Sequence, residues 1–141
     1  MGLAFARMPS GSVFHNQTLW GSIGWATPAA FGAAMAAPQR RTVLITGEGS
    51  HQLTAQEVGQ FYRYGLKPMI FVLNNHGYLI ERLLCKHGEI EYNDVASWNY
   101  QQLPAALGRE NWFTARSPPA ASWIKPSPMP KSVKRGPISK S

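Results

Sequence analysis

One stretch of the chain decides its fold: RTVLITGEGSHQLTAQEVGQFYRYGLKPMIFVLNN, residues 41–75. Two short apolar runs, at 41–46 and 69–73, flank a segment at 55–64 whose apolar residues recur at helical spacing. This order predicts a βαβ unit with two buried parallel strands, and therefore an α/β protein. A right-handed crossover places the carboxyl ends of both strands on one edge of the sheet, where open α/β sheets bind ligands.

Both predicted strands are followed by residues that suit ligand binding. The first ends in GEGS, residues 47–50, and the second in Asn74-Asn75, with 24 residues between Gly49 and Asn74. Gly47 and Gly49 allow the backbone to approach a bulky anion closely. The carboxylate of Glu48, the amide oxygen of Asn75 and the main-chain carbonyl of Gly77 are oxygen ligands of the kind that holds Mg²⁺ against a diphosphate.

Local helix signals add to this pattern. Thr54 and Glu57 fit a capping box, which would begin the helix at Ala55 and leave N–H groups near 50–54 for phosphate oxygens. Thr27 before Pro28 predicts the start of another, Ala-rich helix. A lone Gly-x-Gly is often only a turn and an Asn pair often only a loop, but their joint placement after two strands favours a binding site.

The glycine loop and the Asn pair together resemble the cofactor motif of thiamine-diphosphate-dependent enzymes. More narrowly, LWGSIGW at 19–25, PAAFG at 28–32 and LNNHGYLIE at 73–81 are similar to the pyruvate and indolepyruvate decarboxylase family. The similarity extends from about Trp20 to Gly108. The resemblance implies a truncated parallel-sheet thiamine-diphosphate-binding domain, with thiamine diphosphate and Mg²⁺ as its cofactors.

The same resemblance implies roles for individual residues. Glu48, Asn75 and Gly77 are expected to ligate Mg²⁺. Glu81 is expected to lie over the thiazolium and to take part in decarboxylation and in protonation of the enamine; the alternative is a solvated helix residue. The remaining expected cofactor contacts, among which Ile23 is the wedge that bends the cofactor, are Gly21, Ser22, Ile23, Gly47, Gly49, Ser50, Tyr78 and Ile80.

One ligand position departs from the family pattern, because Glu48 stands where the family almost always has Asp. The carboxylate is retained, but it arrives one methylene further out, and Mg²⁺ demands near-ideal octahedral geometry at about 2.0–2.1 Å. We therefore expect weaker binding of Mg²⁺ and cofactor, or tolerance of a larger ion. His51 and His76 also fall beside the motif, and we interpret them as ordinary loop positions.

The composition divides the chain into unlike parts. Residues 1–110 hold eight Lys/Arg and seven Asp/Glu, whereas residues 111–141 hold six Lys/Arg, no acid and six of the eleven prolines. The tail therefore carries +6 of the net charge of +7. We expect an irregular segment at 1–18, a partial thiamine-diphosphate-binding domain at 19–110, and a Pro-, Lys- and Ser-rich tail at 111–141 that is disordered or out of frame.

Cysteine content and hydropathy bound the location of the protein. Cys85 is the only cysteine, so no internal disulfide exists, and we expect a reducing, cytoplasmic compartment. No apolar run approaches the ~20 residues that a membrane-spanning helix needs. The tail carries no motif for specific nucleic-acid readout. We therefore expect neither a membrane nor a nucleic acid as a partner.

The resemblance also implies a larger functional unit. Family members carry a pyrimidine-binding domain and a central domain before this segment, and they form homodimers or tetramers. The expected function is the diphosphate- and Mg²⁺-binding part of a decarboxylase that converts a 2-keto acid to an aldehyde and CO₂, inactive without the missing domains. The alternatives are a carboligating synthase of the same superfamily and a non-catalytic relic or cofactor-binding module. Glu81 and the context of Ile23 favour the decarboxylase.

Overall fold

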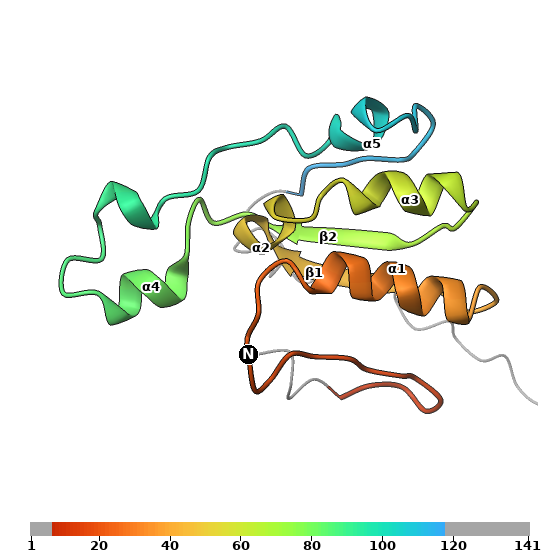
Figure 1. The fold of residues 1–141 in the computed structure, drawn as a ribbon, viewed down its shortest axis with the longest axis horizontal. Helices are drawn as coiled ribbons and strands as arrows, with labels where there is room; N and C mark the ends of the chain where they lie inside the picture. The colour runs from red at the N-terminus through yellow and green to blue at the C-terminus, as the bar shows by residue number, and fades with distance from the viewer. Residues whose placement is uncertain (1–6, 118–141) are drawn as a thin grey trace, which may run out of the picture.

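The fold is a small α/β arrangement built on two strands. The computed structural model describes residues 7–117, and the predicted disorder or frame change beyond residue 117 lies outside the described residues. The elements follow one another along the chain in this order (Figure 1): α1 (Ala26–Ala36), β1 (Val43–Gly47), α2 (Glu48–Gln52), α3 (Glu57–Arg63), β2 (Met69–Leu73), α4 (Leu79–Leu84), the 3₁₀ helix η2 (Glu91–Asn93) and α5 (Leu103–Ala106).

The predicted βαβ unit is confirmed. Strands β1 and β2 pair in parallel, with Val43 opposite Met69 and Gly47 opposite Leu73. The loops that carry Glu48 and Asn75 therefore leave the same edge of the sheet, as the crossover argument requires. Strand β1 begins at Val43 and not at residue 41, so the predicted start was two residues early.

The core lies between the sheet and one layer of helices. Phe61 of α3 is fully buried, and its ring meets Phe31 of α1 edge-to-face with centroids 5.5 Å apart. In Figure 1, α3 and α1 lie on either side of β2, and β1 lies next to α1. The buried apolar side chains of this layer are Ala34, Leu44, Ala55, Val58 and Phe61. This packing fixes the sheet edge from which the candidate site is built.

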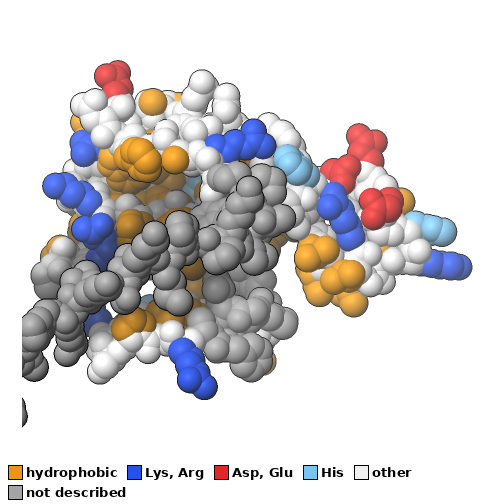
Figure 2. Space-filling view, turned by 180° about the vertical axis from the view of Figure 1, so that it is seen from behind, with side chains coloured by type: hydrophobic (Ala, Val, Ile, Leu, Met, Phe, Trp, Pro, Cys, Tyr) orange, Lys and Arg blue, Asp and Glu red, His pale blue; other side chains and the backbone are white. Residues whose placement is uncertain are grey.

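The opposite face of the sheet is exposed, which corrects the prediction of a strand buried on both faces. Side chains along β1 alternate between exposed and buried, so Leu44 and Thr46 point into the core while Ile45 is 40% exposed. Phe71 of β2 is 49% exposed. Seen from behind, hydrophobic side chains gather on this side of the molecule and on a projecting lobe (Figure 2). The alternation in β1 arises because α1 packs against one face of the sheet, with α3 packed against α1.

Two predicted helix starts were wrong. The segment after β1 forms the short helix α2 and then a turn, and α3 begins only at Glu57, after Gln56. No side chain caps α3, so Thr54 and Glu57 do not form the predicted capping box. Helix α1 begins at Ala26, one residue before Thr27. Both threonine hydroxyls instead bond to distant parts of the chain, and this tertiary bonding replaces the local caps that the sequence predicts.

The segment after β2 leaves the main body. Helix α4 and η2 form a lobe that projects away from the sheet and helix layer in Figure 1, and no residue of α4 is buried. The helix predicted at 99–107 is limited to the single turn of α5. Within the described part of the chain, no helix is long and apolar enough to cross a membrane.

Candidate functional site

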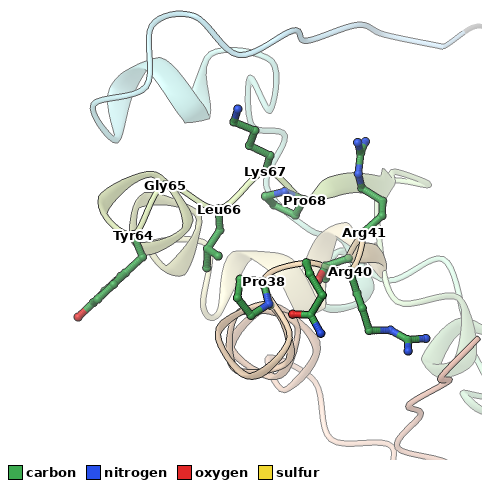
Figure 3. Close-up of a pocket in the computed structure, with 11 residues that line it drawn as sticks. Pro38, Arg40, Arg41, Tyr64, Gly65, Leu66, Lys67 and Pro68 are labelled. Carbon is green, nitrogen blue, oxygen red and sulfur yellow. The ribbon is translucent and has the colours of Figure 1, made fainter.

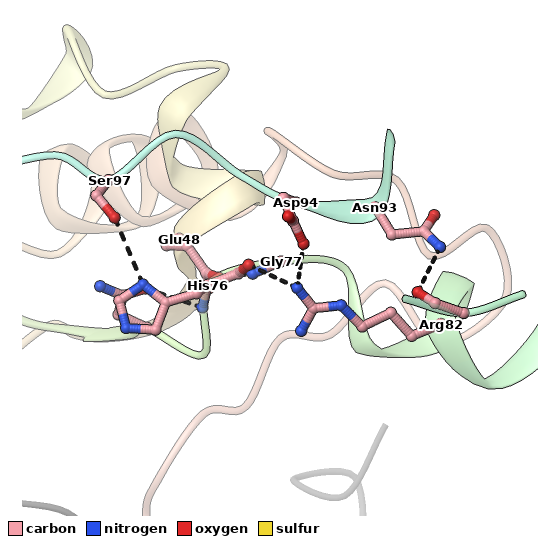
Figure 4. A network of polar contacts seen from close by, with 9 residues as sticks. Glu48, His76, Gly77, Arg82, Asn93, Asp94 and Ser97 are labelled. Atoms are coloured by element: carbon pink, nitrogen blue, oxygen red, sulfur yellow. Dashed lines mark hydrogen bonds and ion pairs between the residues drawn. The ribbon is translucent and has the colours of Figure 1, made fainter. Parts of the chain in front are cut away.

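The centre of the candidate site is the carboxylate of Glu48. Glu48 is the first residue of α2 and is only 3% exposed. The backbone N–H of Gly77 donates to its Oε1 over 2.8 Å (Figure 4). The parallel pairing of β1 and β2 explains this contact between residues 29 positions apart, because it sets their following loops side by side. A buried carboxylate thus meets the loop that contains Asn75 and Gly77.

The side-chain amide of Asn75 completes a cluster of oxygen groups. One terminal atom of this amide lies 3.0 Å from the carbonyl oxygen of Gly77, 3.0 Å from Glu48 Oε1 and 3.2 Å from Glu48 Oε2. With the amide nitrogen at that position, Asn75 donates to all three oxygens. With the amide oxygen there, oxygens of three residues lie 3.0–3.2 Å apart, and a cation between them would offset their repulsion.

The spacing of this cluster is compatible with Mg²⁺ coordination as well as with hydrogen bonds from the Asn75 amide. Adjacent ligands of an octahedral ion with bonds of 2.0–2.1 Å stand about 2.9 Å apart. The distances of 3.0 Å from the Asn75 amide to Gly77 and to Glu48 are close to that value. The structure therefore brings together the three residues that the sequence predicts as ligands. No group of three or more His, Cys, Asp or Glu suited to a metal occurs among residues 7–117, so a metal site here depends on mixed oxygen donors.

The loop of Asn75 is held in place by polar contacts from the lobe. Arg82 of α4 donates to the carbonyl oxygen of His76 over 2.8 Å and pairs with Asp94 at 2.6 Å (Figure 4). Gly77 and Asp94 form an isolated antiparallel bridge. His76 has a φ of 62°, a left-handed conformation that is uncommon for residues other than glycine. His76 is thus part of a tight turn fixed by Arg82, which the sequence did not predict.

The predicted cofactor contacts at 21–23 are joined to the same region through the next residue, Gly24. The N–H of Gly24 donates to Ser50 Oγ over 2.9 Å, and Thr54 Oγ1 donates to the carbonyl oxygen of Gly24 over 2.8 Å. Ile23 is exposed, as are Gly21 and Ser22. The segment is therefore anchored at one end to the residues that follow the glycine loop, while the predicted aminopyrimidine contacts remain accessible.

His51 is a buried residue of α2 and not an ordinary loop position. Its Nδ1 lies 3.0 Å from Thr27 Oγ1, and both side chains are almost wholly buried. Burial lowers the pKa of His51 below its ordinary value of 6.5, so that the imidazole is neutral at pH 7. The pair joins α1 to α2. Local sequence patterns indicate this pair only weakly, since they do not identify the partner that a buried histidine needs.

The packing around position 49 requires a glycine. It is buried, and a Cβ at this position would overlap the ring of Tyr78. The glycine therefore lets Tyr78 pack across α2, whereas a Cβ on Gly47 would meet nothing within 4 Å. The predicted glycine loop thus contains one position required by packing and one that is open.

Two predicted residues lie apart from this cluster. Glu81 and Ile80 are exposed on α4, and the side chain of Glu81 makes no hydrogen bond within the described residues. The predicted catalytic role of Glu81 therefore stays a prediction, and its side chain is free to meet a ligand or another part of a larger protein.

A separate groove of about 510 Å³ lies at the opposite edge of the sheet (Figure 3). The loops after α1 and α3 line it and contribute Arg40, Arg41 and Lys67. Both helices end here, so the negative ends of their dipoles favour these cations without any bound anion. The groove therefore does not belong to the candidate site.

Comparison with known families gives one match that covers most of the chain. Residues 1–122 match the family described as thiamine pyrophosphate enzyme, C-terminal TPP binding domain. The match extends beyond the stretch from Trp20 to Gly108 on which the resemblance rests.

Individual proteins similar to this chain are decarboxylases by name. An alpha-keto-acid decarboxylase of Mycobacterium tuberculosis (strain H37Rv) is 54% identical over 117 residues, covering 82% of this chain and 20% of the relative. One from Mycobacterium ulcerans is 52% identical over the same length. The solved thiamine diphosphate-dependent 4-hydroxybenzoylformate decarboxylase of Rhodococcus jostii RHA1 superimposes with a TM-score of 0.58 at 30% identity, covering 62% of this chain and 17% of that one. The chain spans about a fifth of the length of the curated relatives it matches.

Proposed function

The chain belongs to the thiamine pyrophosphate enzyme family, as its C-terminal TPP-binding domain, and from this premise we propose that it is the diphosphate- and Mg²⁺-binding part of a 2-keto acid decarboxylase. The convergence of Glu48, Asn75 and Gly77 carries the proposal. The identity to alpha-keto-acid decarboxylases supports the reaction class. The proposed product of the larger protein is an aldehyde together with CO₂.

The residues of this chain divide the work between binding and orientation. Glu48, Asn75 and Gly77 would hold Mg²⁺ through oxygen, and Ser50 has a hydroxyl proton left to donate after it accepts from Gly24. Ile23, Gly21 and Ser22 would contact the pyrimidine half. Thiamine diphosphate, when bound, supplies the electron sink for loss of CO₂ from a 2-keto acid. Glu81 would hold or move a proton beside the substrate.

The rest of the active site would come from sequence outside this chain, since the relatives are about five times as long. We propose pyrimidine-binding and central domains and a homodimer or tetramer as the complete assembly. The exposed sheet face and the exposed apolar residues of α4 are consistent with further contacts of this kind.

The first experiment measures metal binding. Electron paramagnetic resonance with Mn²⁺ as the probe, with and without thiamine diphosphate, gives the dissociation constant of the purified chain. Glu48→Ala should weaken Mn²⁺ binding about 100-fold or more because it removes the only charged ligand. Glu57→Ala, which removes an acid from α3 outside the site, should leave it unchanged. Equal Mn²⁺ affinity for wild type and Glu48→Ala would contradict the proposed site.

The longer arm of Glu48 is tested by competition of Mg²⁺ against the Mn²⁺ probe. Glu48→Asp should raise the affinity for Mg²⁺ and thiamine diphosphate, because the shorter carboxylate is the family's usual ligand and Mg²⁺ tolerates little distortion. Equal thiamine diphosphate affinity for wild type and Glu48→Asp would contradict the predicted effect of the longer side chain. It would not contradict the proposed metal site.

A further inference from the structure

The turn that follows the glycine loop bonds to two distant parts of the chain. On one side, Glu48 accepts from Gly77. On the other side, Ser50 and Thr54 both bond to Gly24, and His51 bonds to Thr27. Residues 48–54 therefore connect the predicted metal loop with the segment that precedes α1. The sequence did not predict this connection.

Gly24 is held at both of its backbone polar groups. Its N–H donates to Ser50, and its carbonyl oxygen accepts from Thr54. Its φ of +81° lies in the left-handed region, and a Cβ here would stand 3.1 Å from Leu53 Cβ. The backbone of Gly24 is thus fixed in one conformation and pressed against residues 53 and 54.

The hydroxyl of Thr54 is not needed to form its own turn. The N–H of Thr54 already donates to His51, and the carbonyl oxygen of Thr54 accepts from Glu57. The hydroxyl makes no cap at α3. Its one hydrogen bond therefore serves the contact with Gly24, 30 residues away.

We propose that Thr54 is a positioning residue that sets the segment 21–24 at a fixed distance from the Glu48 loop. The consequence for ligand binding rests on the proposed function, in which these two segments contact opposite halves of thiamine diphosphate. A ligand that spans two segments binds more tightly when their separation is fixed beforehand. Thr54 acts through Gly24 and touches none of the three predicted metal ligands.

The test compares two variants of Thr54. Thr54→Val removes the hydroxyl at nearly constant shape, and Thr54→Ser keeps it. Thr42→Val, at the far edge of the sheet, is the matched control. Amide hydrogen exchange of the ligand-free chain, followed by nuclear magnetic resonance, should be about tenfold faster at Gly24 in Thr54→Val. The N–H of Gly24 bonds to Ser50, and this bond should open more often once the carbonyl of Gly24 loses its bond to Thr54. The dissociation constant for thiamine diphosphate with Mg²⁺ should rise about tenfold. That for Mn²⁺ alone should not change.

Four outcomes of this test can be distinguished. Wild-type amide exchange at Gly24 and a wild-type dissociation constant for thiamine diphosphate in Thr54→Ser support the proposal. Wild-type exchange at Gly24 in Thr54→Val overturns the proposal. A loss of Mn²⁺ affinity in Thr54→Val equal to its loss of thiamine diphosphate affinity also overturns it, because that result indicates general damage to the site. If the wild-type chain binds no thiamine diphosphate, the proposed function fails for this chain alone, and exchange at Gly24 still decides whether Thr54 fixes the segment.

Discussion

His51 shows how one buried side chain links stability to pH. The folded protein holds a neutral imidazole against Thr27, and burial lowers the pKa of His51. The unfolded chain takes up a proton as the pH falls through about 6.5, while the folded state resists protonation. The contribution of His51 is therefore complete above pH 6.5 and declines as the pH falls toward the lower folded pKa.

We predict that the free energy of unfolding in urea falls between pH 7.5 and pH 5.5, and that His51→Asn reduces this fall. Asparagine can bond to Thr27 but does not titrate in this range. His87→Asn, on an exposed side chain, is the control and should keep the wild-type slope. An unchanged slope in His51→Asn would assign the pH dependence to other groups.

At the scale of elements, the lobe of α4 and η2 is joined to the sheet edge mainly by polar contacts. Arg82 bonds to His76 and to Asp94, and Tyr78 donates through its backbone to Asn93. No residue of α4 is buried, so little apolar burial stabilises the helix. The order of the lobe therefore depends on Arg82 more than on packing.

We predict that Arg82→Gln loosens this lobe and leaves the rest of the fold intact. The loss of the charged contacts should lower the local opening free energy by about 1 kcal/mol. Amide exchange should accelerate between Leu79 and Asp94 but not in α1 or α3. Equal acceleration in every element would show that Arg82 supports the whole fold.

At the scale of the whole molecule, the sheet has one covered face and one exposed face. The exposed face carries Val43, Ile45, Met69, Phe71 and Leu73. A contiguous apolar surface of this kind binds hydrophobic dyes and promotes association.

We predict that the isolated chain binds the dye 1-anilinonaphthalene-8-sulfonate and that the double variant Ile45→Thr/Phe71→Thr loses about half of the fluorescence. Because both side chains are largely exposed, the stability should change by less than about 1 kcal/mol. Val13→Thr, at an exposed apolar residue outside the sheet, should leave the dye signal unchanged. Wild-type fluorescence in the double variant would show that this face is not the dye site.

The sequence by itself determined the βαβ unit and the three oxygen donors at its edge. Strand periodicity is local, and the handedness of a crossover leaves one placement for residues that follow two parallel strands. Glu48, Asn75 and Gly77 could therefore be brought together on the basis of order and spacing alone.

Only the tertiary structure decided what the threonines and His51 do. Thr27 and Thr54 follow local capping rules in sequence, but their hydroxyls bond to His51 and Gly24, which lie 24 and 30 residues away. A hydroxyl finds its partner only after the elements pack, and local patterns cannot state which distant group it will meet. The exposure of one sheet face was likewise decided by the tertiary structure. An apolar strand does not itself indicate whether one or both of its faces will be covered.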